Sequence, residues 1–292
     1  MYQVNVEMDS NYQIYVLKDT DTDSWVKVAP ERGGIILSYG VAGDEFLYLN
    51  EETFINPDAN VRGGIPILFP ISGQLSNGTY VWEGETYSMK NHGFARNLPW
   101  EVVEIDTTNR AALTIRLASN EQTRVSYPFD FEVIFTYSLE NGKLTIDQEY
   151  KNKGDRSMPI SAGFHPYFKT SGKHLSYTTD ATRYYDYNDG VEKEFTGSVD
   201  LTNLKESVLL LNSSQPNISF QPPGQKKPIT LRYGSSFKYV VLWTEKDKEF
   251  ICVEPWMAKN DEFNRGEELV IIQGGDSLKT VFSMESGGRM PL

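Results

Sequence analysis

Apolar and polar residues alternate along much of the chain, which is the period of a half-buried β-strand. In residues 143–150, Leu144, Ile146 and Tyr150 alternate with polar side chains, and residues 112–117 follow the same pattern. Short β-prone runs bounded by glycine or charged residues are typical of strands. They predict further strands at residues 12–17, 24–29, 34–40, 46–49, 78–82, 85–89, 131–138, 239–243, 250–253 and 279–284.

Two pairs of strands are separated by two residues that favour tight hairpin turns. These turns are Glu83-Gly84 and Asn141-Gly142, and such turns imply antiparallel pairing. No amphipathic pattern is longer than two or three helical turns, and we find no repeat of about 20 to 50 residues. The pattern predicts an all-β fold, a large antiparallel β-sandwich or barrel. Because such folds commonly reach this size undivided, we expect residues 1–292 to form a single domain.

Four segments interrupt the strand pattern. Residues 60–73 are rich in glycine and proline, and Pro66 and Pro70 lack backbone donors, so we expect a rigid loop across the core rather than a central strand. Residues 171–197 are expected to be polar, tyrosine-rich connections. Residues 201–211 suggest a helical turn followed by a strand, and residues 222–224 a loop.

Composition and charge limit the partners. The net charge is −12, from 40 acidic and 28 basic residues, which disfavours binding to nucleic acids and to anionic membranes. Aromatic residues make up 13% of the chain, a supply that suits strand-rich cores and stacking pockets. The only cysteine, Cys252, lies in an apolar run and is expected to be buried and unpaired. Without a signal-peptide pattern or an apolar window of about 18 residues, we expect a cytoplasmic protein.

Two histidines lie in unusual stretches and are candidates for proton transfer. His165 stands between an apolar run and Pro166, and His92 stands in the segment 91–96. The unperturbed pKa of histidine, about 6.5, suits a proton donor or acceptor near neutral pH. Glu254 follows a wholly apolar strand and precedes Pro255. We therefore expect it at a sheet edge under aromatic cover, where partial burial raises the pKa of a carboxyl group.

Two arginines complete the candidate site. Arg62 and Arg96 both stand beside small residues that let a ligand approach the backbone, and guanidinium groups bind hydroxyls, carboxylates and phosphates. Ligand spacing supports no metal site, and no phosphate loop, dinucleotide fingerprint or His-Glu-x-x-His motif is present. We expect no cofactor.

Four ordered motifs carry a resemblance to a known family. They are Arg62-Gly-Gly-Ile-Pro-Ile-Leu-Phe-Pro70, His92-Gly-Phe-Ala-Arg96, Gly163-Phe-His-Pro-Tyr-Phe168 and Cys252-Val-Glu-Pro255. In these residues the chain resembles the aldose 1-epimerase (galactose mutarotase) family, near its hexose-6-phosphate mutarotase branch. The resemblance implies a β-supersandwich and cofactor-free interconversion of the α and β anomers of a sugar.

The resemblance also implies roles. His165 would be the general acid that protonates the ring oxygen, and Glu254 the general base that takes the proton of the C1 hydroxyl. The reactive form would pair a Glu254 carboxylate with a protonated His165. His92 would bind the sugar near the ring oxygen. The family's substrate-binding aspartate has three possible counterparts, which are Asp186, Asp200 and Glu206.

The expected partner is a small-molecule sugar or sugar phosphate, and the expected state is a monomer or weak homodimer. Arg62 and Arg96 match positions that would grip a phosphate, whereas Ile71-Ser-Gly73 departs from the phosphosugar pattern, where an aromatic residue is common. A non-catalytic carbohydrate-binding protein is the alternative. A glycoside hydrolase ranks last, because it usually needs two carboxylates and only Glu254 stands out.

Overall fold

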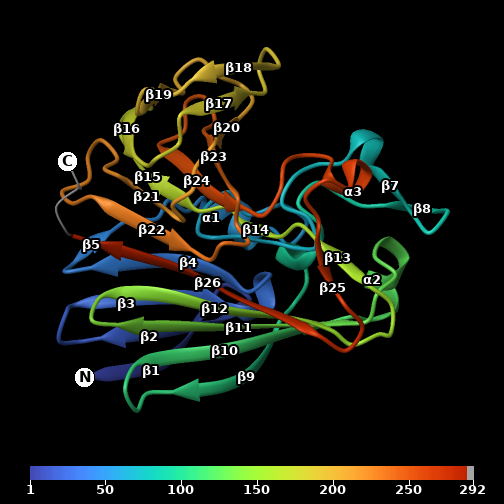
Figure 1. The fold of residues 1–292 in the computed structure, drawn as a ribbon. Coiled ribbons are helices and arrows are strands. Elements are labelled where there is room, and N and C mark those ends of the chain that lie inside the picture. Colours follow the sequence, from blue (N-terminus) through green and yellow to red (C-terminus); the bar gives the residue numbers. More distant parts are fainter. Residues whose placement is uncertain (288–292) are drawn as a thin grey trace.

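Three large sheets built from short and medium strands make up the computed structural model, which describes residues 1–287 (Figure 1). The N-terminal five-stranded sheet has the order β1-β2-β3-β4-β5. Its strands are β1 (Tyr2–Asp9), β2 (Tyr12–Asp19), β3 (Ser24–Ala29), β4 (Ile35–Val41) and β5 (Asp44–Glu45).

The nine-stranded sheet joins the middle of the chain to its C-terminal part, in the order β19-β16-β21-β22-β26-β12-β11-β10-β9. Its strands are β9 (Glu101–Asp106), β10 (Ala111–Ala118), β11 (Phe131–Glu140), β12 (Lys143–Asn152), β16 (His174–Thr178), β19 (Ser198–Asp200), β21 (Asn217–Phe220), β22 (Ile229–Tyr233) and β26 (Ser277–Ser286).

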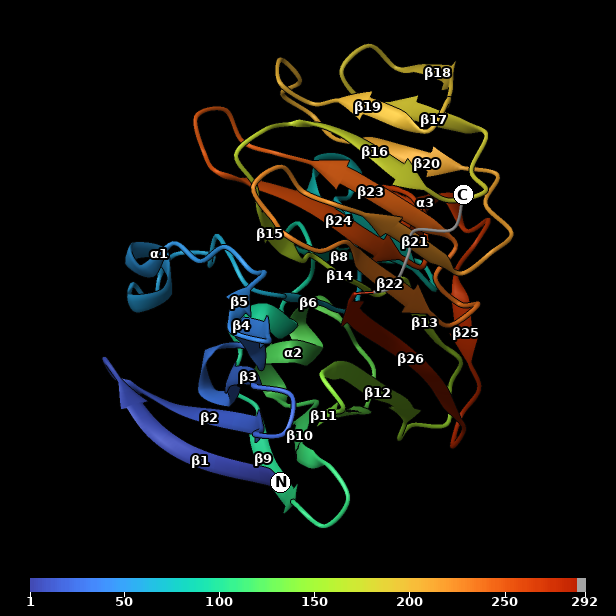
Figure 2. The same ribbon diagram turned by 90° about the vertical axis from the view of Figure 1, so that its left-hand side faces the viewer.

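The third sheet has eight strands: seven follow one another in the order β18-β17-β20-β23-β24-β14-β6, and the eighth, β15, pairs with β24 off this path. Its strands are β6 (Ile67–Leu68), β14 (Gly163–Phe164), β15 (Tyr167–Lys169), β17 (Arg183–Asp186), β18 (Val191–Glu194), β20 (Val208–Leu211), β23 (Tyr239–Trp243) and β24 (Phe250–Trp256). Figure 2 shows β17, β20, β23 and β24 following one another as neighbours.

Two small sheets and several short helices complete the described residues. The small sheets pair β7 (Thr79–Trp82) with β8 (Glu85–Ser88) and β13 (Met158–Ile160) with β25 (Val270–Ile272). The α-helices are α1 (Glu51–Ile55), α2 (Glu121–Ser126) and α3 (Glu262–Arg265), and the 3₁₀ turns are η1 (Pro30–Arg32), η2 (Ser76–Gly78) and η3 (Ala95–Asn97). Within residues 1–287, no helix has the length and apolar character needed to cross a membrane.

Both predicted hairpins are confirmed, and so is the all-β fold class. Glu83 and Gly84 have φ of 51° and 86°, and Asn141 and Gly142 have φ of 51° and 75°. Positive φ at both turn residues matches the twist of the flanking strands. In β11 and β12 the predicted alternation appears as buried side chains on one face, because that face packs in the core.

Three sequence-based predictions were wrong in detail. Residues 171–197 hold β16, β17 and β18 rather than irregular connections. These strands have only four or five residues, so the alternation of buried Leu175 and Tyr177 in β16 is too short to be distinctive, and β18 is almost wholly exposed. Residues 46–49 form only isolated bridges, Leu47 with Phe168 and Leu49 with Gly63. Residues 201–207 hold one hydrogen-bonded turn, in which the amide of Leu204 donates to the carbonyl of Leu201, but no helix, and the strand expected after it is β20.

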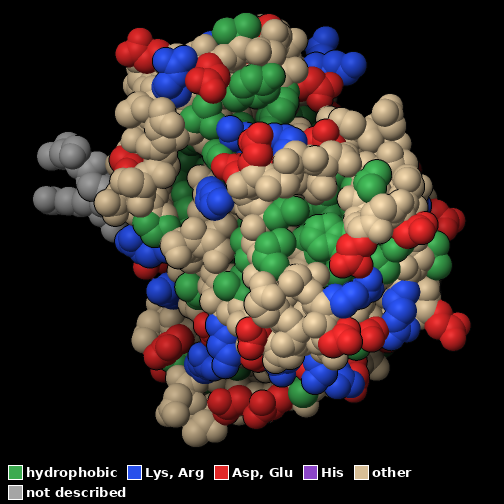
Figure 3. Space-filling view, turned by 45° about the vertical axis from the view of Figure 1, so that its right-hand side comes forward, with side chains coloured by type: hydrophobic (Ala, Val, Ile, Leu, Met, Phe, Trp, Pro, Cys, Tyr) green, Lys and Arg blue, Asp and Glu red, His purple; other side chains and the backbone are tan. Residues whose placement is uncertain are grey.

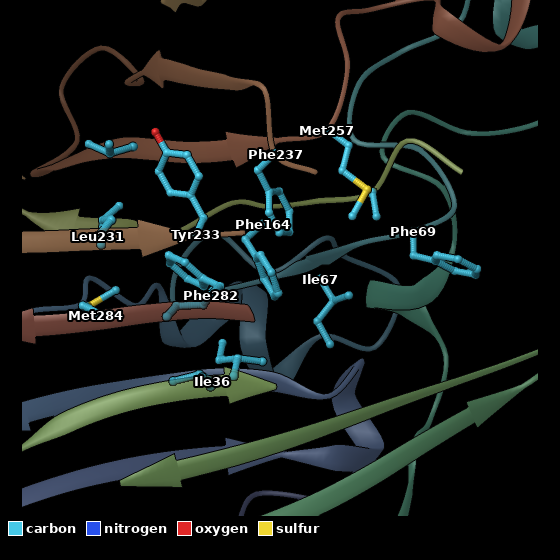
Figure 4. Packing of buried hydrophobic residues seen from close by; sticks show 14 of the residues in the cluster. Ile36, Ile67, Phe69, Phe164, Leu231, Tyr233, Phe237, Met257, Phe282 and Met284 are labelled. Atoms are coloured by element: carbon cyan, nitrogen blue, oxygen red, sulfur yellow. The ribbon is translucent and has the colours of Figure 1, made fainter. Parts of the chain in front are cut away.

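The eight-stranded and nine-stranded sheets face each other through aromatic side chains (Figure 4). Phe164 of β14 stacks on Phe282 of β26, with ring centroids 4.9 Å apart. Phe168 of β15 meets Phe220 of β21 edge-to-face at 5.0 Å. These contacts fix the position of β14 and β15, and His165 lies between these two strands.

The five-stranded sheet packs against the nine-stranded sheet through buried tyrosines. The hydroxyl of Tyr39 in β4 donates to the carbonyl of Gly142, and the hydroxyl of Tyr137 in β11 donates to the carbonyl of Gly34. Each hydroxyl is thus buried with a partner, as an apolar core requires. The three sheets form an extended sandwich, the class that the pattern predicted.

The glycine- and proline-rich segment 60–73 crosses the core as predicted, and it also contributes a two-residue end strand. β6 pairs with β14, through Leu68 with Gly163 and Ile67 with Phe164. β6 lies at one end of the eight-stranded sheet, where a segment flanked by Pro66 and Pro70 can pair on one side without needing their missing donors. The loop thereby holds one side of the histidine segment.

Candidate active site

The strand register brings His165 and Glu254 face to face. β14 pairs with β24 through Gly163 and Trp256, and β15 pairs with the same strand through Tyr167 and Cys252. Counting inward from both pairs places His165 opposite Glu254. Directly opposed residues of antiparallel strands project to one face with Cβ atoms about 5 Å apart. Accordingly, Nδ1 of His165 lies 3.4 Å from Oε1 of Glu254.

Glu254 lies inside β24 and not at a sheet edge, so this expectation was wrong. β24 continues to Trp256 because Pro255 faces Val240 of β23 without interrupting the strand. The Glu254 side chain is 1% exposed. Its Oε2 accepts a hydrogen bond of 3.1 Å from Nε1 of Trp256. The aromatic cover expected from the sequence is therefore Trp256, two residues along the same strand, which also donates a hydrogen bond to Glu254.

Aromatic side chains fix the orientation of the His165 ring. The ring stacks on Tyr167 at 4.6 Å with an angle of 7° between planes, and Trp243 meets it edge-on at 5.7 Å. The backbone amide of His165 donates to the carbonyl of Pro66 at 3.1 Å. The ring nitrogen Nδ1 is buried and makes no hydrogen bond within the described residues. The ring is held in place by packing, and its Nδ1 faces Oε1 of Glu254 without a hydrogen bond between them.

Burial moves the pKa values of the two groups in opposite directions. It lowers the pKa of His165 well below 6.5, and the nearby His92, Arg96 and Arg62 add to this effect. It raises the pKa of Glu254 well above 4.5. Charged forms lose hydration in a buried site. The free pair therefore favours neutral histidine with protonated glutamate, which differs from the charged pair expected for the reactive form.

His92 lies beside this pair as a neutral hydrogen-bond acceptor. Its ring is 5.4 Å from the His165 ring and 5.8 Å from the Trp256 ring. Burial lowers its pKa to about 3, and Nδ1 bonds to the carbonyl of Ser72. Since a carbonyl only accepts, Nδ1 carries the proton and Nε2 presents a lone pair.

The backbone of the His92 loop is specified by Gly93. His92 and Gly93 have φ of 66° and 69°. A Cβ atom at Gly93 would lie 2.2 Å from the carbonyl oxygen of Phe69. Glycine is the residue that combines this conformation with so close an approach, which gives the His-Gly pair of the motif a physical cause.

The two arginines differ in position. Arg62 lines the cavity described below, where its guanidinium lies over the ring of Trp243 at 5.4 Å and its Nε is 3.8 Å from Glu245. Arg96 does not line that cavity; its Nη2 donates to the carbonyl of Asn91. Burial lowers the pKa of Arg96 to about 10. Its positive charge nevertheless contributes to the lowered pKa of both histidines.

One cavity of about 630 Å³ collects four of the five predicted site residues. Arg62, His92, His165 and Glu254 line it, and its volume falls within the range of small-ligand pockets, about 300 to 1,000 Å³. Sequence reasoning missed much of its wall, including Trp243, Trp256, Gln74, Asn260 and Lys205. Glu254 and Trp256 are two residues apart in one strand and so share a face, which could have placed Trp256 in the site from the sequence.

A loop at residues 202–207 forms one wall, and Asn188 holds it. Oδ1 of Asn188 accepts from the amides of Lys205 and Glu206, at 2.9 Å and 2.8 Å. Of the three acids considered for an additional sugar contact, Glu206 lines the cavity. Asp186 is buried against Lys193 at 2.5 Å, and Asp200 bonds to Thr202 outside the cavity lining.

Solved structures with the same fold define the class of protein. The Slr1438 protein from Synechocystis sp. PCC 6803 superposes with a TM-score of 0.92 at 34% identity, covering 99% of this chain and 100% of that one. A galactose mutarotase-like protein from Lactobacillus casei ATCC 334 superposes with a TM-score of 0.75 at 22% identity, covering 98% and 100%. The fold is therefore that of the galactose mutarotase-like proteins.

Sequence comparison gives the family. The family model for aldose 1-epimerase matches residues 15–285, and the chain belongs to this family. A "Putative glucose-6-phosphate 1-epimerase" of Salmonella typhimurium is 31% identical over 139 residues, which are 47% of this chain and 42% of that protein; the match thus spans less than half of that relative. The resemblance read from the four motifs is confirmed. The family favours an isomerase over a non-catalytic carbohydrate-binding protein.

Proposed function

We propose that the protein interconverts the α and β anomers of an aldohexose or hexose 6-phosphate, with His165 and Glu254 as the acid and base. The observation that carries the proposal is the 3.4 Å approach of the two side chains in a cavity that both of them line. An acid and a base must reach one sugar ring together, and each contributes about 10²- to 10⁴-fold to the rate. Membership of the aldose 1-epimerase family supports the reaction type.

In the proposed reaction, His165 donates its proton to the ring oxygen while Glu254 takes the proton of the C1 hydroxyl. The bond between C1 and the ring oxygen breaks, C1 becomes an aldehyde carbon, and the ring oxygen becomes a hydroxyl. Rotation about C1–C2 followed by the reverse transfers closes the ring as the other anomer. Ring opening leaves Glu254 protonated and His165 neutral, which is the state that burial favours in the free site.

His92 would bind a sugar hydroxyl rather than donate to the ring oxygen. Its Nδ1 proton is used by the carbonyl of Ser72, so Nε2 can only accept. This refines the role implied by the family resemblance. Trp243 and Trp256 provide the apolar faces against which the C–H groups of a sugar ring can pack.

Basic side chains support the 6-phosphate as a substrate alongside the free sugar. Arg62, Lys205 and Lys246 line the cavity, and the name of the Salmonella relative is that of an enzyme acting on glucose 6-phosphate. Acidic side chains are also present, since Glu206 and Glu245 line the same cavity. On the face drawn in Figure 3, basic and acidic side chains are intermixed in a similar way.

The test is the rate of anomer exchange in freshly dissolved α-glucose, α-galactose and glucose 6-phosphate, followed by polarimetry or NMR with and without the protein. We expect acceleration of at least one of these sugars. Arg62→Leu should lower the rate with glucose 6-phosphate more than with glucose, whereas Arg110→Leu, at an exposed ion pair with Asp147, should change neither. Sugar binding without any acceleration would contradict the proposal.

Three further statements remain predictions. Residues 1–292 are proposed to act as one domain, and the largest buried cluster, which runs from Leu17 to Met284, supports this. Cytoplasmic location stays a prediction; the buried, unpaired Cys252 is compatible with it. A monomer or weak homodimer is proposed, to be measured by sedimentation equilibrium.

A further inference from the structure

The fold places the single cysteine beside the proposed acid and base. Ligand atoms of His165, Cys252 and Glu254 all lie within 4.8 Å of one another, and all three residues are buried. Cys252 and Glu254 are two residues apart in β24, so their side chains project from the same face of the sheet. Tyr167 of β15 faces Cys252 directly. No metal-ligand spacing is visible along the chain because His165 lies about ninety residues before Cys252 and Glu254.

The three donors match the ligand set of a thiophilic divalent metal ion. Imidazole, thiolate and carboxylate are the side chains that bind zinc, and three protein ligands with an open fourth position are typical of zinc sites that react with solvent or substrate. Donors around a tetrahedral zinc ion lie roughly 3 to 4 Å apart, given bonds of about 2.0 to 2.3 Å. His165 and Glu254 already meet this spacing, at 3.4 Å. Side-chain rotation of the order of 1 Å would bring Cys252 into range.

The state of the histidine nitrogen also points to a ligand at this place. Nδ1 of His165, the atom 3.4 Å from Oε1 of Glu254, makes no hydrogen bond within the described residues, while the residue is only 5% exposed. Buried polar atoms without a partner are rare and need an explanation. A bound cation also satisfies the charges: one thiolate and one carboxylate balance a divalent ion, so the occupied site is neutral in a buried environment.

We propose that His165, Cys252 and Glu254 form a site for Zn²⁺ or Cd²⁺, and that occupation of this site excludes the proton-transfer reaction. The metal enters from the cavity, which His165 and Glu254 line, and meets the Cys252 thiol behind them. Binding releases the thiol proton and any proton held by the pair, so affinity rises with pH. Metal binding itself is independent of the proposed function, whereas its inhibitory effect rests on that function.

The experiment titrates the intact protein, freed of metal by a chelator, with Cd²⁺ and Zn²⁺. We expect one ion per chain, an ultraviolet thiolate-to-Cd²⁺ charge-transfer band, and no competition from excess Mg²⁺ or Ca²⁺, which prefer oxygen ligands. X-ray absorption of the zinc-loaded protein should show one sulfur at about 2.3 Å with nitrogen or oxygen ligands at about 2.0 Å. The absence of a sulfur ligand, or of saturable binding, would overturn the proposal.

Variants separate the metal site from the reaction. Cys252→Ala should abolish the charge-transfer band and weaken zinc binding by at least about 10- to 100-fold, the loss known for an outer-shell partner. It should retain anomer exchange, because Cys252 does not line the cavity. The control His174→Ala removes the exposed third histidine and should leave binding unchanged. If Cys252→Ala fails to fold, the sulfur ligand seen by X-ray absorption in the wild-type protein decides the matter.

Inhibition is measured separately. Zn²⁺ should stop anomer exchange by the wild-type protein at one equivalent and spare Cys252→Ala at the same concentration. Saturable Cd²⁺ binding through Cys252 in a protein that exchanges no anomers would uphold the metal site and refute the proposed function. Equal Cd²⁺ affinity in the wild-type protein and Cys252→Ala would refute the metal site alone.

Discussion

Replacing Glu254 by glutamine should lower activity and raise stability at neutral pH. The amide keeps the shape of the side chain and an oxygen to accept from Nε1 of Trp256, at 3.1 Å in the wild-type protein. It cannot take a proton from a sugar hydroxyl. Loss of a general base costs about 10²- to 10⁴-fold in rate, which raises the activation barrier by about 3 to 5 kcal/mol.

The sign of the stability change follows from the pKa of Glu254. Burial raises this pKa above the ordinary value of 4.5, so the folded state keeps a proton that the unfolded chain releases. Stability is therefore lost as pH rises through 4.5 towards the folded pKa. Glutamine does not ionise in either state. Glu254→Gln should exceed the wild type in free energy of unfolding at pH 7, and the difference should vanish below pH 4.5.

The assay pairs anomer-exchange kinetics with urea denaturation at several pH values. Glu262→Gln is the control: this carboxylate is also buried, pairs with Arg265 at 3.4 Å, and does not line the cavity. It should leave the rate unchanged and should not raise stability, because glutamine removes its ion pair. Near-wild-type kcat in Glu254→Gln would refute its role as base. A variant less stable than the wild type at pH 7, with equal stability below pH 4.5, would refute the electrostatic reasoning.

The remaining predictions concern the acid, the pH profile and the histidine loop. His165→Asn should fold and lose about 10²- to 10⁴-fold in rate, and near-wild-type turnover would contradict its role as acid. Activity should pass through a maximum with pH, because the pair must hold one proton; a rate that still rises at about pH 9 would contradict this. Gly93→Ala should cost about 1 to 3 kcal/mol in unfolding free energy, since its Cβ would lie 2.2 Å from the Phe69 carbonyl oxygen. Gly84→Ala, with nothing within 4 Å of its Cβ, should cost less in the same urea titration.

The sequence predicted the long strands and the residues of the site better than their arrangement. β11, β12 and their Asn141-Gly142 turn follow from local alternation and turn chemistry, which tertiary contacts only reinforce. The strands between residues 174 and 200 are three to five residues long. β17 and β18 pair as a local hairpin, but β16 pairs with β19 and β21 and β17 also pairs with β20, at longer sequence separations. Runs this short carry no distinctive period.

The register at the site was beyond local reasoning. His165 faces Glu254 because β14 and β15 attach to β24 on both sides of it, and neither segment carries an alternation long enough to set that register. The same limit applies to the wall at residues 202–207, which is held by amide bonds to Asn188. By contrast, one relation could have been predicted from the sequence. Cys252, Glu254 and Trp256 are each two residues apart in β24, so their side chains lie on the same face.

Full burial of the pair bears directly on how the proposed reaction proceeds. A sugar ring must meet protonated His165 and ionised Glu254, the arrangement that burial disfavours in the free site. Ring opening then moves both protons and leaves the neutral pair, so burial stabilises the open-chain state relative to the ring form. The opened sugar is the high-energy species on this path, and interactions that grow stronger as it forms are those that raise the rate. Burial thus raises the free energy of the charged pair before ring opening, and this free energy is recovered when ring opening converts the pair to its neutral form.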